Sequence, residues 1–260
     1  MEKPEKRSTA IVLAAGNGRR MNSPVAKQFL LLEDRPVLWY SLQAVEHSPI
    51  IDDCILVTGE DDIAHVREEI VDRYGFHKVD AVVAGGRERY ESVYRALCVL
   101  AEGGLSVPNR DGYVFIHDGA RPFLTERILQ DTFDAVRAYH ACVAAVPSKD
   151  TVKLADEEGF AVSTPARRLV WNIQTPQVFD TPLVLAAYFK FMEGLKAGSG
   201  QTVTDDASVV ELYSDIKVKL VEASYENIKI TTPEDLSFAE SLLRRMEIYA
   251  SALTHLHFAK

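Results

Sequence analysis

Short apolar runs that alternate with longer amphipathic stretches are the feature that most limits what this chain can fold into. The runs are rich in Val, Ile and Ala, as expected for strands buried on both faces of a parallel sheet. They cover residues 9–14, 54–58, 79–84, 113–117 and 141–146. The stretches between them carry apolar residues with helical spacing, at 37–48, 63–74, 90–101 and 125–138. The alternation predicts an α/β fold, with a mostly parallel sheet flanked by helices on both faces.

Residues 148–169 interrupt this alternation directly after Pro147. Two short β-like pieces, 151–154 and 160–163, flank an acidic turn that ends at Gly159, which is typical of a hairpin that leaves the main sheet. Strand and helix signals return near 171–174, 182–196, 217–222 and 233–246. No repeat or linker-like tract divides the chain. We therefore expect one domain over residues 1–260, with 148–169 as an inserted, protruding β-arm and 246–260 as a C-terminal extension; two domains are the alternative.

Composition excludes several functional classes. Lys and Arg number 29 and Asp and Glu 38, a net charge of −9 without a basic block, which argues against a protein that grips nucleic-acid phosphates. Cys54, Cys98 and Cys142 lie far apart and form no CxxC pair, which favours a reducing compartment over a disulfide frame or zinc site. No apolar stretch approaches the roughly 20 residues of a membrane span. We therefore expect a cytoplasmic protein with neither nucleic acid nor membrane as a partner.

A glycine-rich turn follows the first predicted strand. The segment Ala14-Ala15-Gly16-Asn17-Gly18 exposes backbone N–H groups, which bind phosphates well, and Arg20 and Lys27 add positive charge. Two better-known phosphate motifs are absent, because the dinucleotide fingerprint needs a glycine where Met21 stands and the P-loop needs a Gly-Lys-Ser/Thr run. For this segment alone, an ordinary turn with solvated arginines is the alternative interpretation.

Two further loops come after predicted strands and are therefore expected at the same edge of the sheet. Asp118 directly follows the strand 113–117, at the carboxyl edge where ligands bind in open α/β sheets. A carboxylate there is suited to Mg²⁺, which binds through one or two carboxylates together with substrate phosphates. The other loop begins at Gly85-Gly86 and reaches Ser92. The alternative for Asp118 is a purely structural turn. His117 is expected to pack or form hydrogen bonds beside the strand, without a metal role.

Seven sequence blocks, in order along the chain, resemble those of the 2-C-methyl-D-erythritol 4-phosphate cytidylyltransferases. They read AAGNGRRM…KQF, AGGRERYESV, HDGARPF, VPSKDTVK, WNIQTPQVF, TDDAS and ENIKITTPEDL, at residues 14–29, 84–93, 117–123, 146–153, 171–179, 204–208 and 226–236. The resemblance covers about residues 9–245. It implies a Rossmann-like nucleotidyltransferase fold and an enzyme that transfers CMP from CTP to 2-C-methyl-D-erythritol 4-phosphate, giving 4-diphosphocytidyl-2-C-methyl-D-erythritol and pyrophosphate.

The resemblance also implies a role for each site residue. The catalytic residues are Arg20 and Lys27, which neutralise the triphosphate, and Arg167 and Lys229, which place the acceptor phosphate. The acceptor site further includes Thr151 and Thr175. CTP is bound by Ala14, Ala15, Gly16, Gly18, Gly85, Gly86, Ser92 and Asp118. Asp118 is also the implied ligand of Mg²⁺, with other divalent cations as alternatives. The 148–169 arm is implied to embrace a second subunit, which makes the protein a homodimer.

The sequence leaves two alternative functions open. Ribitol 5-phosphate cytidylyltransferases share the fold and the CTP site, but the Ala14-Ala15-Gly16 turn, the Gly119-Ala120 pair and the run 167–171 favour the methylerythritol phosphate enzymes. A non-catalytic, nucleotide-sensing relative is the more distant alternative. Loss of the matched arginine, lysine or aspartate would support it, and all three residues are present.

Two other polar motifs are expected to lack a direct part in the chemistry. Thr204-Asp205-Asp206 looks like a helix N-cap followed by an acidic first turn, so we interpret it as mainly structural, although its place in a matching block leaves a site role open. His255 and His257 form an HxH pair near the end of the chain, to which we assign no function.

Overall fold

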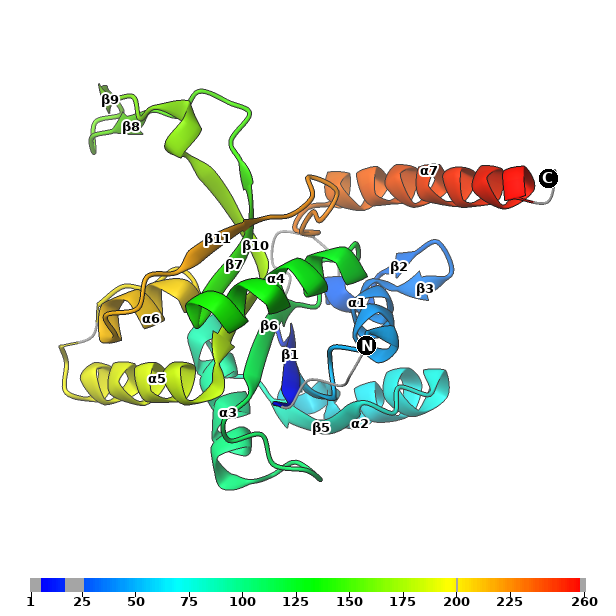
Figure 1. The fold of residues 1–260 in the computed structure, drawn as a ribbon, viewed down its shortest axis with the longest axis horizontal. Coiled ribbons are helices and arrows are strands. Elements are labelled where there is room, and N and C mark those ends of the chain that lie inside the picture. The colour runs from blue at the N-terminus through cyan, green and yellow to red at the C-terminus, as the bar shows by residue number, and fades with distance from the viewer. Residues whose placement is uncertain (1–5, 17–25, 200, 258–260) are drawn as a thin grey trace.

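The computed structural model describes residues 6–16, 26–199 and 201–257, with side chains up to Met246. Within these residues the centre of the fold is a seven-stranded sheet in the order β11-β7-β10-β6-β1-β4-β5 (Figure 1). Its strands are β1 Ser8–Ala14, β4 Asp53–Thr58, β5 Val79–Ala84, β6 Tyr113–Asp118, β7 Ala141–Pro147, β10 Trp171–Asp180 and β11 Lys219–Glu222. The five strands predicted from the apolar runs are confirmed, with ends that differ by one residue or not at all.

The sheet is mostly parallel, as predicted, with one strand reversed. Strand β1 pairs in parallel with β4 and β6, β4 with β5, and β7 with β11. Strand β10 is antiparallel to both β6 and β7, between which it lies. The sequence indicated a strand at 171–174 but not its direction. The inserted arm separates this strand from β7, so no short connection shows whether the two strands run parallel or antiparallel.

Helices cover both faces of the sheet (Figure 1). On one face are α1 Val37–His47, α2 Ile63–Val66 with the π-helical turn Arg67–Asp72 that continues it, and α4 Glu126–Tyr139. On the other are α3 Arg89–Glu102, α5 Thr181–Lys196 and α6 Asp206–Tyr213. Successive strand residues point to opposite faces, so Val12 packs with the first set and Ile11 with the second. Both are fully buried, which explains why the strand reads as an unbroken apolar run.

The predicted arm is a hairpin of β8 Leu154–Ala155 and β9 Ala161–Ser163, which pair antiparallel. Figure 1 shows it held away from the sheet on the ends of β7 and β10. A second small hairpin, β2 Leu31–Leu32 with β3 Arg35–Pro36, was not predicted. Single turns of 3-10 helix occur at Lys27–Phe29, Glu60–Asp62 and Arg167–Leu169.

The last helix, α7, covers Pro233–His257 and is longer than the predicted 233–246. Residues 247–257 contain neither Gly nor Pro, so nothing in the sequence ends the helix at Met246. Near its start, Ala239 and Leu242 pack with Phe123 and Ile230 in a small third core. This packing places the loop before α7, which carries Lys229, beside the loop that follows β6.

Candidate active site

A cavity of about 180 Å³ opens at the carboxyl ends of β1 and β6. It is lined by Leu13, Ala14, Ala15, Gly16, Lys27, Gln28, Gly86, Arg87, Glu88, Arg89, Ser92, Asp118, Ala120 and Lys229. Most of the predicted nucleotide-site residues that the structure describes therefore meet in one place. Gly18 and Arg20, predicted for the same site, lie outside the described residues.

Close packing of two loops forms the wall on the β1 side. A Cβ atom on Gly85 would stand only 2.3 Å from the Cβ of Ala15, so Gly85 holds the second loop against the first rather than lining the cavity itself. The backbone N–H of Gly86 donates to Ser92 Oγ at 3.0 Å, which folds the loop back onto the start of α3. The side-chain amide of Gln28 donates to the carbonyl of Ala14 at 2.5 Å. These contacts fix backbone groups at the cavity without bulky side chains.

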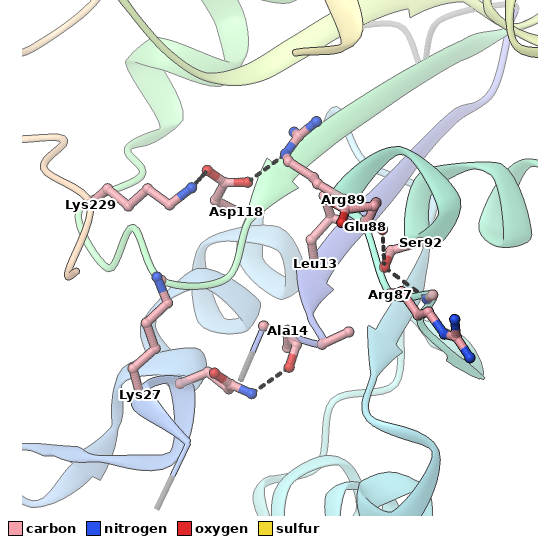
Figure 2. A pocket seen from close by; sticks show the side chains of 14 residues that line it. Leu13, Ala14, Lys27, Arg87, Glu88, Arg89, Ser92, Asp118 and Lys229 are labelled. Carbon is pink, nitrogen blue, oxygen red and sulfur yellow. Dashed lines mark hydrogen bonds and ion pairs between the residues drawn. The ribbon is translucent and has the colours of Figure 1, made fainter. Parts of the chain in front are cut away.

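Asp118 is the charged centre of the site. Its side chain is 10% exposed, and Figure 2 shows it between Lys229 and Arg89. Lys229 Nζ lies 2.7 Å from Oδ2, Arg89 Nε lies 3.3 Å from Oδ1, and Arg121 Nε lies 3.9 Å from Oδ2. Burial opposes ionisation, but the charges of Arg89, Lys229 and Arg121 outweigh it and hold the pKa of Asp118 well below its usual range. The carboxylate is therefore ionised at neutral pH.

A second cavity adjoins the first and shares Asp118, Arg89 and Lys229 with it. Its other lining residues come mainly from β10 and from the segment before α6: Arg121, Ile173, Gln174, Thr175, Gln177, Thr204 and Asp205. The hydroxyl of Thr175 accepts a hydrogen bond of 3.0 Å from the backbone N–H of Asp118. Thr175 and Lys229, both predicted for the acceptor site, therefore contact Asp118, and their roles stay predictions.

His117 lies behind Asp118 and forms hydrogen bonds, as predicted for it. Its Nε2 is 3.3 Å from the carbonyl oxygen of Arg121, which can only accept, so this nitrogen carries the proton. Its Nδ1 then accepts from the hydroxyl of Thr175 at 3.0 Å. Burial lowers the pKa of His117 to about 4, so the ring is neutral at pH 7.

The remaining predicted residues lie in two places. Lys27 Nζ donates to the carbonyl of Ile230 at 3.0 Å, which ties the first loop to the segment that carries Lys229. Thr151 and Arg167 lie together at the base of the arm, where Arg167 Nη2 donates to Thr151 Oγ1 at 3.0 Å. Both are exposed, and neither lines the two cavities of its own chain.

Three residues in or next to this site were not assigned to it by the sequence analysis. Arg89 and Arg121 belong to matching blocks and line the second cavity, but an arginine in a loop carries no signal of what it will pair with. Asp206 was interpreted as a helix-start residue, and Asp205 is indeed the N-cap of α6, accepting from Ser208 N. Asp206, however, is completely buried and paired with Arg89, which spacing along the chain does not reveal.

The side chains around Asp118 limit the kind of metal ion that could bind there. Among the described residues, no three His, Cys, Asp or Glu side chains gather closely enough to hold one. Asp118 fits the narrower requirement of Mg²⁺ bound with a substrate, which needs only one or two carboxylates besides phosphate oxygens. It is ionised and lines both cavities, although Lys229 and Arg89 would compete for its oxygens.

In the described part of the chain, no helix combines the length and apolar character needed to cross a bilayer.

A protein-family comparison matches most of this chain. The family model of 2-C-methyl-D-erythritol 4-phosphate cytidylyltransferase (IspD) matches residues 8–245. The protein of that name from Lachnoclostridium phytofermentans is 47% identical over 236 residues, which are 91% of this chain and 96% of that protein. The protein of the same name from Lachnospira eligens is 45% identical over 237 residues, which are 91% of this chain and 99% of that protein.

Solved structures agree with the sequence comparison. The crystal structure of 4-diphosphocytidyl-2C-methyl-D-erythritol synthase from Anaerococcus prevotii is similar with a TM-score of 0.78 and 36% identity, covering 92% of this chain and 96% of that one. The 2-C-methyl-D-erythritol 4-phosphate cytidylyltransferase of Francisella tularensis gives a TM-score of 0.71 and 30% identity, covering 90% and 98%.

Proposed function

This chain belongs to the 2-C-methyl-D-erythritol 4-phosphate cytidylyltransferase family, and we propose that its two adjoining cavities hold the two substrates of that reaction. The protein is a cytidylyltransferase that transfers CMP from CTP to 2-C-methyl-D-erythritol 4-phosphate. The products are 4-diphosphocytidyl-2-C-methyl-D-erythritol and pyrophosphate. We base this assignment on the junction of the two cavities. They share Asp118, Arg89 and Lys229, where two phosphate-bearing substrates would meet.

The chemistry is an in-line displacement at phosphorus. An oxygen of the acceptor phosphate attacks the α-phosphorus of CTP, the bond to the bridging oxygen breaks, and pyrophosphate leaves. Little covalent help is needed, so positioning and charge neutralisation supply most of the catalysis. The chain's own part is to bring two anionic groups together and to hold them in line.

We assign the cavity beside β1 to CTP. Backbone groups of Ala14, Ala15 and Gly16 face the nucleotide there, with Gly86 and Ser92 opposite them and Gly85 as the packing residue between the two loops. Small residues let the backbone approach the base closely. Lys27, and Arg20 by resemblance, neutralise the triphosphate as the transition state forms.

We assign the cavity beside β10 to the acceptor. Lys229 Nζ is held 2.7 Å from Asp118, and an arriving phosphate would draw it away from that carboxylate. Arg121, which also lines this cavity and donates to the carbonyl of Asn227 at 2.7 Å, offers a second cation. Thr175, which lines the same cavity, fixes the backbone of Asp118 through its hydroxyl. These groups orient the nucleophilic phosphate toward the CTP side.

Asp118 is our candidate ligand for Mg²⁺ bound together with the CTP phosphates. The ion, when bound, would neutralise phosphate charge and orient the triphosphate. Asp118→Asn keeps the size of the side chain but loses a charged oxygen, so it should raise the Mg²⁺ concentration needed for half-maximal activity. An unchanged Mg²⁺ dependence would place the metal elsewhere.

The arm supports a homodimer with shared active sites. Leu154, Phe160 and Val162 are 54%, 69% and 63% exposed, an apolar surface that a single chain leaves uncovered. A two-fold dimer covers both copies with one self-complementary contact. Thr151 and Arg167 lie on the arm, away from the cavities of their own chain, so we assign them to the partner's acceptor site.

Subunit complementation tests the shared site. A Lys27→Ala chain and an Arg167→Ala chain are each expected to be nearly inactive. Mixed dimers would contain one intact site, so activity should rise above that of either parent after subunit exchange. Parental activity despite demonstrated exchange would show that Arg167 works within its own chain.

Substrate choice is tested by pyrophosphate release. CTP with 2-C-methyl-D-erythritol 4-phosphate should support turnover, whereas CTP with ribitol 5-phosphate should support far less. Equal rates with both sugar-alcohol phosphates would contradict the assignment of the second cavity. We place the enzyme in the cytoplasm, because Cys54, Cys98 and Cys142 are free thiols.

A further inference from the structure

Arg89 connects the site to a buried carboxylate that the proposed mechanism does not use. Its Nη1 and Nη2 donate to the two oxygens of Asp206, each at 2.7 Å, while its Nε points to Asp118 Oδ1 at 3.3 Å. The charges of Asp206 and Asp118 outweigh burial and raise the pKa of Arg89 further. One guanidinium therefore bridges a carboxylate in the site and a carboxylate outside it.

Asp206 is the fixed end of this bridge. Its side chain is fully buried, and the hydroxyl of Tyr188 donates to Oδ1 at 2.5 Å. The helix that it begins is anchored as well, because Gln177 of β10 accepts from Ala207 N at 2.8 Å and donates to Asp205 at 3.0 Å. The position of Asp206 is thus set by α5, α6 and β10 together.

The geometry of the pair limits what Arg89 can do at Asp118. A bidentate arginine–carboxylate pair is the strongest arrangement that a guanidinium forms with a carboxylate. Here Asp206 takes both terminal nitrogens, and only Nε is left for Asp118, at a longer distance. Without Asp206, the terminal nitrogens would be free to pair with Asp118 and to compete with Lys229 for Oδ2.

We propose that Asp206 is a positioning residue, which by anchoring Arg89 keeps that arginine to a single contact with Asp118 and leaves Oδ2 to Lys229. The proposal rests on the proposed function of Asp118 and Lys229 at the junction of the two cavities. It extends that function, because the start of α6 then helps to determine how the charged side chains are arranged around the reacting phosphates.

The chain offers a closely matched control pair for a purely structural role. Arg7 and Asp53 form an ion pair at the amino ends of β1 and β4, the edge of the sheet opposite the site. The side-chain exposures are 29% and 6% in this pair and 30% and 0% in the Arg89–Asp206 pair. Asp53→Asn therefore removes a similar buried charge without touching the site.

The experiment is a double-mutant cycle. For each variant, kcat, KM for each substrate and thermal unfolding are measured. The variants are Asp206→Asn, Arg89→Ala and the double variant, with Asp53→Asn and Asp118→Asn for comparison. Asp206→Asn should lower kcat about 10-fold or more, because small displacements of reacting groups are costly. The double variant should be no slower than Arg89→Ala within about twofold, since Asp206 acts through Arg89. Asp53→Asn, which removes a buried charge away from the site, should leave kcat and KM within about twofold of wild type.

The results separate failure of this proposal from failure of the proposed function on which it rests. Wild-type kinetics in folded Asp206→Asn, or effects of Asp206→Asn and Arg89→Ala that multiply, would overturn the proposal. If Asp206→Asn does not fold, Arg89→Lys replaces it, since lysine keeps the charge but not the bidentate fork. Arg89→Lys should also lose kcat about 10-fold, and normal kinetics in this variant would overturn the proposal. Wild-type kinetics in Asp118→Asn would instead refute the proposed function on which it rests.

Discussion

Removal of the titratable ring of His117 gives the most quantitative test of the structure. The hydrogen bonds fix the neutral form of this histidine, because the Arg121 carbonyl requires a proton on Nε2 and the Thr175 hydroxyl donates to Nδ1. Protonation of Nδ1 would point its N–H at the Thr175 hydroxyl hydrogen, so that two donors would face each other in a buried place. His117→Asn keeps a polar side chain of smaller size that does not titrate.

The pKa of His117 gives the size and the sign of the effect. It lies at about 4 in the folded chain, below the ordinary value of 6.5, because the ring is buried. Between these values the unfolded chain binds a proton that the folded chain does not, so stability falls as pH decreases. With about 1.4 kcal/mol for each pKa unit, the full loss is about 3 kcal/mol, of which about 2 kcal/mol falls between pH 7 and pH 4.5.

The assay is urea denaturation at pH 7 and at pH 4.5. The unfolding free energy of wild type should fall by about 2 kcal/mol more than that of His117→Asn over this range. Other groups titrate in both proteins and cancel in the comparison. His77 is exposed, so His77→Asn controls for the loss of a histidine in itself and should keep most of the wild-type pH dependence. Equal pH dependence in wild type and His117→Asn would refute the argument that the ring is buried in its neutral form.

Three further predictions follow from the site. Gly85→Ala should raise KM for CTP about 10-fold or more with the fold retained, because the new Cβ must displace the Ala15 loop. Steady-state kinetics measures KM, and a melting curve shows whether the fold is retained. Lys27→Ala should lower kcat about 100-fold at nearly unchanged melting temperature, so normal turnover would remove Lys27 from the catalytic set. Deletion of residues 150–163 should give a monomer that binds CTP but does not turn over, as judged by sedimentation and calorimetry; a dimeric product would contradict the role of the arm.

Much of the fold was predictable, because it depends on patterns that are local in sequence. The strand β1 and the helix α4 each carry their own signal, a continuous apolar run in one case and an apolar stripe at helical spacing in the other. The carboxyl-edge rule then placed Asp118 beside the glycine-rich turn without any knowledge of distances. Two features were not predicted: α7 continues past Met246 because no residue there stops it, and the short β2–β3 hairpin was missed.

The pairing of charges at the site could not be predicted in the same way. Arg89 and Asp206 are separated by more than a hundred positions, and each has a sufficient local explanation, a loop arginine and an acidic helix start. Only the packing of α3 against α5, with α6 beside it, makes them partners. A carboxylate that lies in a helix's first turn and is also completely buried signals a long-range partner, but burial is known only once the fold is known.

The reversed direction of β10 explains why the arm and the second cavity lie at the same edge. Strand β7 ends at Pro147, opposite Trp171, where β10 begins, so the residues between them leave the sheet at the carboxyl edge of β7. Because β10 runs back antiparallel to β6, Gln177 pairs with Ile116 and the residues just before it pass Asp118. Thr175 therefore reaches the site from the start of a strand, whereas Asp118 reaches it from the end of one. A parallel strand in this position would have begun at the opposite edge, so the chain between β7 and β10 would have had to cross the sheet instead of turning back at the carboxyl edge.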